Sequence, residues 1–186
     1  MDPAAQLQSY LRADESLLWS GKPDPRVWFA PSDRSAIPFS LLWGGFSIFW
    51  ETEALSAGSR LLIPQLFGLP FVAIGVYMIF GRFIVKHVRK KGTVYGITTR
   101  RAIVIDRRSM ADMPLRGQAI SIQRSRDARH ASVLIGDQGR ARDPNSGMEF
   151  LDRSGQAPFG LWDVADPEGM LAALDQARSL PPAARP

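Results

Sequence analysis

Residues 61–81 form an uncharged run of 21 residues, LLIPQLFGLPFVAIGVYMIFG, bracketed by Arg60 and Arg82. As an α-helix this run would be about 31 Å long, which matches a bilayer hydrocarbon core of about 30 Å. A helix buried inside a soluble domain is the weaker interpretation, because a small domain rarely surrounds such a helix on all sides. Pro64 and Pro70 fit a membrane span, since spanning helices accept proline better than soluble ones. The run therefore predicts a membrane span.

A second uncharged run, residues 35–50, has 16 residues and reads SAIPFSLLWGGFSIFW. Alone it is short for a span, but a helix over residues 35–55 would have about 21 residues. Trp28, Phe29 and Trp50 flank it, where aromatic rings anchor a span at the bilayer interface. We therefore expect a first span over residues 35–55, with a re-entrant or interfacial segment as the alternative.

The connection between the two predicted spans, residues 51–60, is short, so the spans would form an antiparallel hairpin. It carries Arg60 together with Glu51 and Glu53. Small residues allow two helices to pack closely, although they also occur by chance. The glycines placed for such packing are Gly44, Gly45, Gly68 and Gly75.

Basic residues flank the predicted hairpin on both of its terminal sides. Because cytoplasmic loops carry an excess of lysine and arginine, both termini are predicted to be cytoplasmic. The chain start lacks the basic segment and apolar run of a secretory signal. We expect a multi-pass protein of the plasma (inner) membrane. The basic residues before the hairpin are Arg12, Lys22, Arg26 and Arg34.

Positive charge is concentrated in one block of the sequence. The chain carries a net charge of +5, yet residues 82–130 hold 13 basic and 3 acidic side chains. Such a block predicts an anionic partner: a membrane surface, nucleic acid or an acidic protein. Nucleic acid is disfavoured, because residues 105–130 contain no Phe, Tyr or Trp on which a base could stack. The predicted membrane- or anion-contacting residues are Arg82, Lys86, Arg89, Lys90 and Lys91 beside the membrane, and Arg107, Arg108, Arg124 and Arg126 in a cationic rim.

The remaining sequence predicts a β-rich domain. We expect the second span to continue as a helix to Lys91, and Gly92 begins a region of short strands separated by Gly, Asp, Arg and Pro. Asp166 as N-cap and Pro167 at the first helical position predict a final helix. Such a helix needs a sheet to cover, which gives an α+β class. Before the first span we expect a short helix within residues 4–18 and a strand over residues 17–20. The later strands are expected over residues 93–97, 102–106, 119–124, 132–136, 148–152 and 159–162.

Three segments follow one another in a recognisable order: ESLLWSGKP at residues 15–23, YGITTRR at residues 95–101 and VADPE at residues 164–168. With two spans between the first and second segments, the chain resembles bacterial membrane proteins that carry a pleckstrin-homology (PH)-like domain. The likeness covers most of residues 15–178. It implies a bent antiparallel β-sheet or barrel capped by a C-terminal α-helix. It also implies a binding or scaffolding role and no reaction.

Three residues of the second segment are assigned a structural role. Tyr95 would share one strand face with Ile97, and Thr98 would hydrogen-bond the backbone of the following turn. Arg101 would reach a carbonyl oxygen or an acidic side chain nearby. Direct contact of these residues with a ligand is the alternative.

The sequence offers little for catalysis. It contains no cysteine, which excludes disulfides, cysteine-bound zinc, iron–sulfur clusters and thiol nucleophiles. His87 and His130 are too few for a multi-histidine metal site, and both are expected at the surface. We therefore expect no catalytic residue, no metal, no cofactor and no enzyme activity.

Four segments are expected: an N-terminal cytosolic segment (1–34), a two-helix transmembrane hairpin (35–81), a juxtamembrane basic segment with a PH-like domain (82–180), and a tail (181–186). The predicted function is a membrane-anchored binding or scaffolding module for protein interaction or membrane-complex assembly. The alternatives are a sensor of anionic phospholipid headgroups and a membrane enzyme with an unrecognised site. Expected partners are the lipid bilayer and a membrane or cytosolic protein, with anionic headgroups and a second copy of the chain left open.

Overall fold

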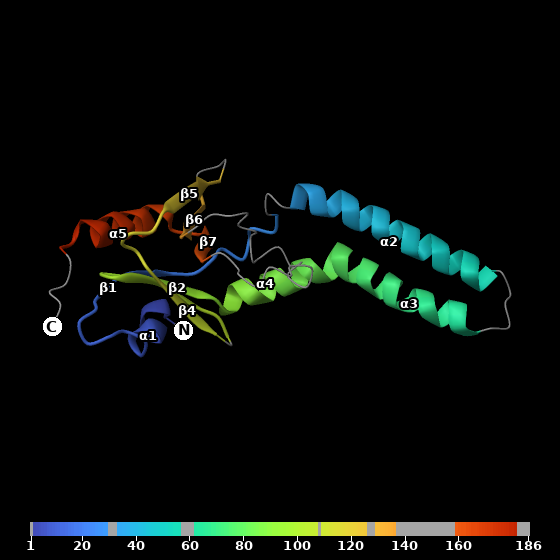
Figure 1. The fold of residues 1–186 in the computed structure, drawn as a ribbon, viewed down its shortest axis with the longest axis horizontal. Helices are drawn as coiled ribbons and strands as arrows, with labels where there is room; N and C mark the ends of the chain where they lie inside the picture. Colours follow the sequence, from blue (N-terminus) through green and yellow to red (C-terminus); the bar gives the residue numbers. More distant parts are fainter. Residues whose placement is uncertain are drawn as a thin grey trace. The chain divides into compact units, whose positions relative to one another are not determined.

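The computed structural model describes residues 2–29, 33–56, 62–107, 109–125, 129–136 and 159–181. Contacts divide the chain into two compact units. The first, here called the β unit, comprises Met1–Val27, Val88–Asn145 and Ser154–Pro186. The second, the helical unit, comprises Trp28–His87 and Ser146–Arg153. Figure 1 labels most of the helices and strands of both.

The described residues of the β unit form two antiparallel sheets with strand orders β1-β2-β3-β4 and β5-β6-β7. In the first sheet β1 pairs with β2, although residues 22–93 separate them in sequence. The segment that begins at Leu17 is therefore part of the sheet. The strands are β1 (Leu17–Gly21), β2 (Val94–Thr98), β3 (Arg101–Ile105), β4 (Met110–Pro114), β5 (Ile120–Arg124), β6 (Ala131–Ile135) and β7 (Gly160–Val164).

The alternation of side chains along β2 separates two hydrophobic clusters. Tyr95 and Ile97 belong to the main core, whereas Val94 faces a smaller cluster with Leu7. Neighbouring residues of a strand point to opposite faces, so one strand contributes to both clusters. The main core also includes Val133 and Leu161 of the second sheet and Met170 and Leu174 of the C-terminal helix.

In the described part of the chain, two helices lie wholly within the β unit. Helix α1 (Pro3–Gln8) places Leu7 against β2 at Gly96, where an added Cβ would come within 2.9 Å of a Leu7 methyl carbon. Helix α5 (Pro167–Ser179) begins as predicted, because the Asp166 side chain accepts a hydrogen bond from the Gly169 backbone and Pro167 stands first in the helix. Its buried face is formed by Met170, Ala173, Leu174 and Ala177.

The helical unit is built on two helices that lie side by side and run in opposite directions (Figure 1). They are α2 (Asp33–Ser56) and α3 (Leu62–Val76), and α3 continues through the π-helical turn η1 (Tyr77–Gly81) into α4 (Arg82–Gly92). The helices approach most closely at glycine, since a Cβ on Gly75 would lie 3.0 Å from Gly44 Cα. Gly68 packs against Glu51, whereas Gly45 has no neighbour within 4 Å of an added Cβ.

The expectation of two membrane spans needs a correction. Within the described residues, one helix, Gly68–Gly92, is long and apolar enough to cross a membrane. Helix α2 has sufficient length, but serine, glycine and glutamate interrupt its apolar residues, among them Ser40, Ser47 and Glu51. A two-span, multi-pass arrangement is thus not supported by length and composition. The helix after the second predicted span does extend through the basic stretch, to Gly92.

The structure agrees with the predicted class at the level of two antiparallel sheets and a C-terminal helix. The expected hairpin of β2 and β3 is present, as are strands at the predicted places for β1, β5, β6 and β7. Strand β4 was not predicted, because its sequence MADMP has no β-branched residue. The strand predicted over residues 148–152 lies outside the described residues.

Candidate functional site

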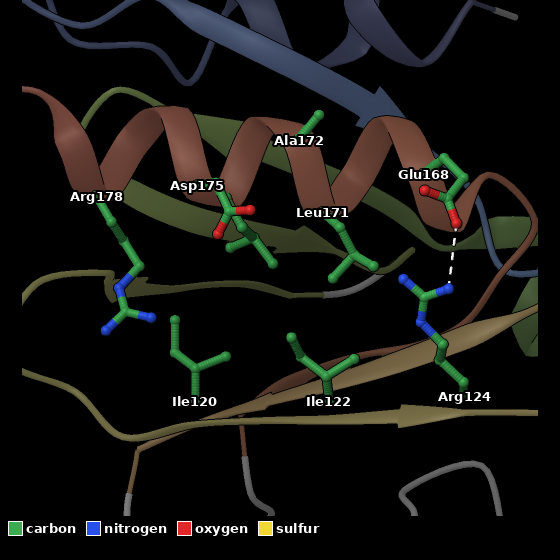
Figure 2. Close-up of a pocket in the computed structure, with 9 residues that line it drawn as sticks. Ile120, Ile122, Arg124, Glu168, Leu171, Ala172, Asp175 and Arg178 are labelled. Carbon is green, nitrogen blue, oxygen red and sulfur yellow. Dashed lines mark hydrogen bonds and ion pairs between the residues drawn. The ribbon is translucent and has the colours of Figure 1, made fainter.

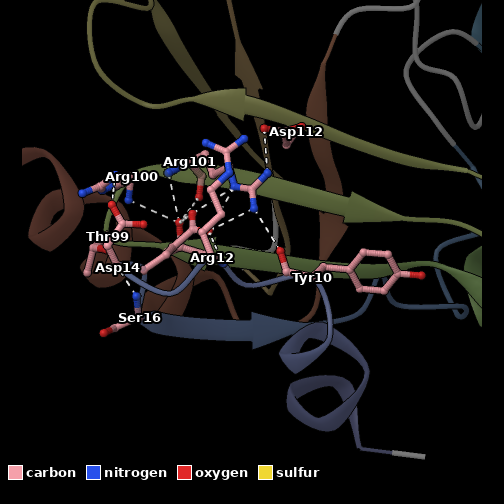
Figure 3. A network of polar contacts seen from close by, with 10 residues as sticks. Tyr10, Arg12, Asp14, Ser16, Thr99, Arg100, Arg101 and Asp112 are labelled. Atoms are coloured by element: carbon pink, nitrogen blue, oxygen red, sulfur yellow. Dashed lines mark hydrogen bonds and ion pairs between the residues drawn. The ribbon is translucent and has the colours of Figure 1, made fainter. Parts of the chain in front are cut away.

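Arg101 lies at the centre of a buried polar network that joins the chain before the helical unit to the chain after it (Figure 3). Its Nε lies 2.9 Å from Glu15 Oε1, and its Nη2 lies 3.0 Å from Glu15 Oε2. Nη2 also donates to the Tyr10 carbonyl at 3.0 Å, and Nη1 pairs with Asp112 Oδ2 at 2.9 Å. The guanidinium fork therefore ties together the segment before β1, strand β3 and strand β4.

Thr98 completes this network at the turn between β2 and β3. Its Oγ1 accepts hydrogen bonds from the backbone N–H groups of Arg100 and Arg101, at 3.2 and 3.0 Å, and it lies 2.6 Å from Glu15 Oε1. These are the contacts expected for Thr98 and Arg101. Tyr95 shares the main core with Ile97, and its hydroxyl accepts from the backbone N–H of Trp162 at 3.2 Å.

The network determines the charge state of Glu15. Burial acts to raise the pKa of this carboxyl group, but hydrogen bonds from Arg101, Thr98 and the Arg12 backbone outweigh it. The pKa of Glu15 therefore lies below its ordinary value of 4.5. A carboxylate held ionised by a fork of donors serves to stabilise the fold and is poorly suited to proton transfer near neutral pH.

A second buried network surrounds Lys90, near the end of α4. Its side chain is 1% exposed, forms an ion pair with Asp163 and donates to the Val27 carbonyl at 2.8 Å. Asp163 has a left-handed backbone, with φ of 51°, and its N–H donates to Ser132 Oγ. Lys90 was predicted to contact an anionic surface, but the structure places its charge inside the β unit.

Asp24 and His130 form a neighbouring pair in the β unit. Asp24 Oδ2 lies 2.9 Å from His130 Nε2, and both side chains are 18% exposed. Burial acts to raise the pKa of Asp24, but the Arg26 N–H and the His130 side chain outweigh it and hold the pKa below 3.8. His130 is thus partly buried against a partner, where the sequence predicted a surface residue.

Arg82 and Lys86, the first two residues of the predicted juxtamembrane set, are also buried. In the helical unit, Arg82 Nη1 lies 3.4 Å from Asp33 Oδ1, and Lys86 Nζ lies 3.7 Å from Asp33 Oδ2. Their side chains are 1% and 4% exposed. We name Asp33, Arg82 and Lys86 the ion cluster of the helical unit. Its cations are turned toward the protein and away from any outer surface.

The other predicted cations are spread over the β unit. Lys91 and Arg107 are exposed, and Arg107 lies against Gly92, where an added Cβ would come within 2.7 Å of Arg107 Nε. Arg89 is partly buried, and Arg124 pairs with Glu168 at 3.2 Å. Arg108 and Arg126 lie outside the described residues.

Sequence reasoning missed the acidic partners of these cations. Glu15 stands in the first quoted segment, yet its pairing with Arg101 was not foreseen. Asp33 and Asp163 were not singled out at all. Lone acidic residues beside an apolar run or next to a strand are the available signal, since a buried cation requires a partner.

An open groove lies between strand β5 and helix α5, with a volume of about 430 Å³ (Figure 2). Ile120 and Ile122 point from β5 toward the helix, and Leu171 points back toward them. The Arg124–Glu168 pair lies at one end, and Arg178 lies at the other. Ile122 is 50% exposed and stands, with Tyr10 and Val88, among the few large apolar side chains that the described β unit exposes.

The groove combines an apolar floor with charges of both signs. Strand β5 ends its sheet in the order β5-β6-β7, so within the described residues one edge of β5 has no neighbouring strand. An edge strand beside an apolar groove can accept an extended peptide as an added strand. The sequence did not predict this surface, because residues 120–124 and 168–178 are brought together only by the fold.

The described residues offer no group of three His, Asp or Glu side chains arranged to hold a metal ion. His87, which was expected at the surface, is partly buried and stacks on Trp28 with ring centroids 5.3 Å apart.

The sequence matches no protein-family model, no curated protein and no solved structure.

Proposed function

We propose that this chain is a membrane-anchored, non-catalytic binding module, whose helical unit lies in the bilayer and whose β unit binds a protein partner. One observation carries the membrane assignment: the described residues of the helical unit expose mainly large apolar side chains and bury several polar ones. Its buried residues include Ser40, Gly44, Ser47 and Glu51. Its exposed residues include Leu42, Phe46, Phe49, Trp50, Leu69, Ile74, Phe80 and Ile84.

Such a surface is unfavourable in water and suited to lipid. An exposed apolar patch that extends along the described parts of both helices exceeds what soluble monomers present. Helices in membranes pack through small residues, as Gly44 and Gly75 do here. The burial pattern therefore supports placing α2 beside the spanning helix, although the composition of α2 alone does not identify it as a span.

The pairing of β1 with β2 supports the same arrangement. These strands precede and follow the helices, yet they are neighbours in one sheet and must lie on the same side of a membrane. A single crossing between them would put them on opposite sides. This pairing supports our proposal of an even number of crossings, with α2 as the partner of Gly68–Gly92 in the described part of the chain. The basic flanks favour the cytoplasmic side for both termini.

The topology can be tested with single cysteines, because the chain has none of its own. We expect Ser56→Cys to react with a membrane-impermeant maleimide on intact cells, and Ala172→Cys to react only after permeabilisation. Ser9→Cys, which reports the N-terminal side, should behave like Ala172→Cys. Labelling of Ser9→Cys and Ser56→Cys from the same side would contradict a crossing by α2.

The β unit retains the proposed PH-like assignment. A four-stranded and a three-stranded antiparallel sheet, with a C-terminal helix packed on the core, support that likeness. So does the role of Thr98 and Arg101 at the turn after β2. We assign no catalytic step to this unit, since Glu15 and Asp163 are paired with the cations Arg101 and Lys90, and Asp24 is paired with the His130 ring.

The groove between β5 and α5 is the proposed protein-binding surface, and its occupant is an extended segment of a partner protein. Such a segment would pair with the β5 edge and place an apolar side chain beside Ile122. Charges of both signs at the groove ends suit a peptide with mixed charges, and the Glu168 and Asp175 carboxylates disfavour an anionic headgroup.

A photoreactive residue tests this surface. Incorporated at Ile122 in the full chain, it should crosslink one defined membrane or cytosolic protein, whose purified form should bind wild-type chain and lose binding to Leu171→Asp. The matched control is Gln123, the next residue of β5, which is also exposed. Equal crosslinking from both positions would contradict a groove-specific partner.

The second candidate function is recognition of anionic lipid headgroups. The observation that favours it is the exposure of two cations near Gly92: Lys91 precedes it in the chain, and Arg107 packs against it. In nanodiscs, a dye on Ser109→Cys should then report contact with the membrane that requires anionic lipid, weakens with salt and disappears in Lys91→Gln/Arg107→Gln. A dye signal that is the same with and without anionic lipid would exclude headgroup recognition by Lys91 and Arg107.

A further inference from the structure

A cluster of aromatic and aliphatic residues, most of them exposed, lies on the surface of the helical unit. Trp28 stacks on His87 with centroids 5.3 Å apart and planes at 21°, and Phe29 meets Phe83 edge-on at 5.8 Å. Together with Phe80 and Ile84, the three aromatic residues Trp28, Phe29 and Phe83 line an open apolar hollow of about 270 Å³. We name Trp28, Phe29, Phe80, Phe83 and Ile84 the aromatic collar.

The collar is exposed to an unusual degree for its composition. Trp28 is 47% exposed, Phe29 69%, Phe80 65% and Ile84 61%. Phe80 and Ile84 are one helical turn apart on the helix Gly68–Gly92, so the collar continues the apolar outer surface of that helix.

The charged residues at the same level point the other way. Arg82 and Lys86 alternate with the collar along the helix, yet both are buried against Asp33. The Arg82 guanidinium also lies over the Phe83 ring, 4.6 Å from its centroid. In water, flexible basic side chains extend outward and aromatic rings turn inward, because burying an ion is costly. The reversed arrangement fits an apolar environment outside the helix at this level.

We infer that the aromatic collar is a lipid-binding surface that lies in the interfacial layer of the bilayer, so that the membrane boundary runs past Ile84 and not at Arg82. The inference rests on the proposed membrane location of the helical unit, and it adds the depth at which the collar lies in the bilayer. Tryptophan prefers this layer, where its ring is partly in hydrocarbon and its N–H remains near water.

The position of the collar also indicates where the ion cluster lies in the bilayer. Asp33, Arg82 and Lys86 lie at the level of the collar, and the two cations share the Asp33 carboxylate inside the protein, where intramembrane ionisable residues usually pair. Arg82 and Lys86 therefore do not bind headgroups. The first outward-facing lysine on this helix is Lys91.

Spin labels on single cysteines test the depth of the collar in the full chain, reconstituted in phosphatidylcholine vesicles. Accessibility to oxygen, which concentrates in lipid, is compared with accessibility to a polar nickel chelate. We expect labels at Phe29 and Ile84 to report the interfacial layer, a label at Leu42 to report greater depth, and a label at Lys91 to report water. Leu42 is 74% exposed and so accepts a label without repacking.

The outcomes separate the inference from the proposed function. A deep label at Leu42 with fully aqueous labels at Phe29 and Ile84 would overturn the collar and leave the membrane assignment intact. Aqueous labels at all four positions would overturn both. As a check without labels, the Trp28 contribution to fluorescence is obtained as the difference between the wild-type chain and Trp28→Phe. This contribution should be quenched by lipid brominated near the headgroup end of the acyl chain. The contribution of Trp19 in strand β1, obtained in the same way with Trp19→Phe, should not be quenched.

Discussion

Arg101 donates to both carboxylate oxygens of Glu15 across a separation of 86 residues in sequence, with Nε–Oε1 and Nη2–Oε2 distances of 2.9 and 3.0 Å. The two residues stand on opposite sides of the helical unit along the chain. Their contact, with the pairing of β1 and β2, fastens the segment before the helices to the sheet that follows them. The helices are thus an insertion between two strands of one sheet. The ion pair stabilises the place where the chain leaves this sheet before the helices and returns to it after them.

Removing one partner of this pair should destabilise the β unit strongly. Glu15 is 0% and Arg101 6% exposed at the side chain, so Glu15→Gln leaves a buried guanidinium with less charge compensation. We expect a loss of about 3–5 kcal/mol in the free energy of unfolding. Arg101→Lys should also be costly, because an ammonium group cannot replace the planar fork.

The matched control is the neighbouring pair of Arg100 and Asp14, whose side chains are 37% and 55% exposed. Asp14→Asn should cost less than about 1 kcal/mol, since exposed ion pairs contribute little. Denaturant unfolding of the full chain in detergent micelles, followed through the β-sheet signal, checks both variants. Equal effects of Glu15→Gln and Asp14→Asn would contradict the special role of the buried pair.

Stability of the β unit should fall in acid. The pKa values of Glu15 and Asp24 are held below their ordinary values of 4.5 and 3.8. A carboxyl with a depressed pKa in the folded state stabilises the protein above its unfolded pKa, and that contribution is lost as the pH falls through the folded pKa. We therefore expect the unfolding midpoint to decline below about pH 4.5 and to be insensitive to these groups near neutrality.

The variant Glu15→Gln separates the contribution of this residue. It removes the titrating carboxyl, so its stability should decline less steeply with acid than that of the wild-type chain. Thermal unfolding recorded at a series of pH values between about 3 and 7 measures both slopes. Parallel curves would show that the acid sensitivity arises elsewhere.

The elements that were predicted correctly are those whose signals are local. The β2–β3 hairpin follows from β-branched and aromatic residues around Thr98, and α5 follows from Asp166 and Pro167 at its start. Strand β4 has no such signal, and it forms because it can pair with the edge of β3 that β2 leaves free. Local sequence therefore predicts most strand positions, but it does not predict the strand β4 that completes the first sheet.

The candidate sites were less predictable, because they depend on contacts between distant residues. Arg82 and Lys86 follow an apolar run, which normally indicates cations at a membrane surface. Their burial depends on Asp33, which stands before the first run and reaches them only when α2 packs on α3. The groove is similar, since Ile122 and Leu171 come from separate elements. Polar pairing and surface shape belong to the fold and not to any one segment.

The contact between Gly44 and Gly75 should control the stability of the helical unit. A Cβ on Gly75 would lie 3.0 Å from Gly44 Cα, which is backbone and cannot turn aside. We expect Gly75→Val to separate the helices and to cost about 1–3 kcal/mol. Gly45→Val is the matched control, because nothing lies within 4 Å of its added Cβ. Thermal unfolding in micelles, followed by helix content, should show a lower midpoint for Gly75→Val alone, and an equal shift for both would contradict glycine-mediated packing.

Lys90 and Asp163 should behave as a coupled pair. Lys90→Met removes the cation and leaves the Asp163 carboxylate partly buried, so we expect a loss of about 3 kcal/mol in the free energy of unfolding. Asp163→Asn should also destabilise, while asparagine tolerates the left-handed backbone at this position. The double variant should lose less stability than the sum of the two single losses, because it removes both charges and leaves neither without its partner. Lys91→Met, an exposed neighbour, serves as the control and should change stability by less than about 0.5 kcal/mol. Strict additivity in the double-mutant cycle would contradict the pairing and would assign the single effects to independent packing losses.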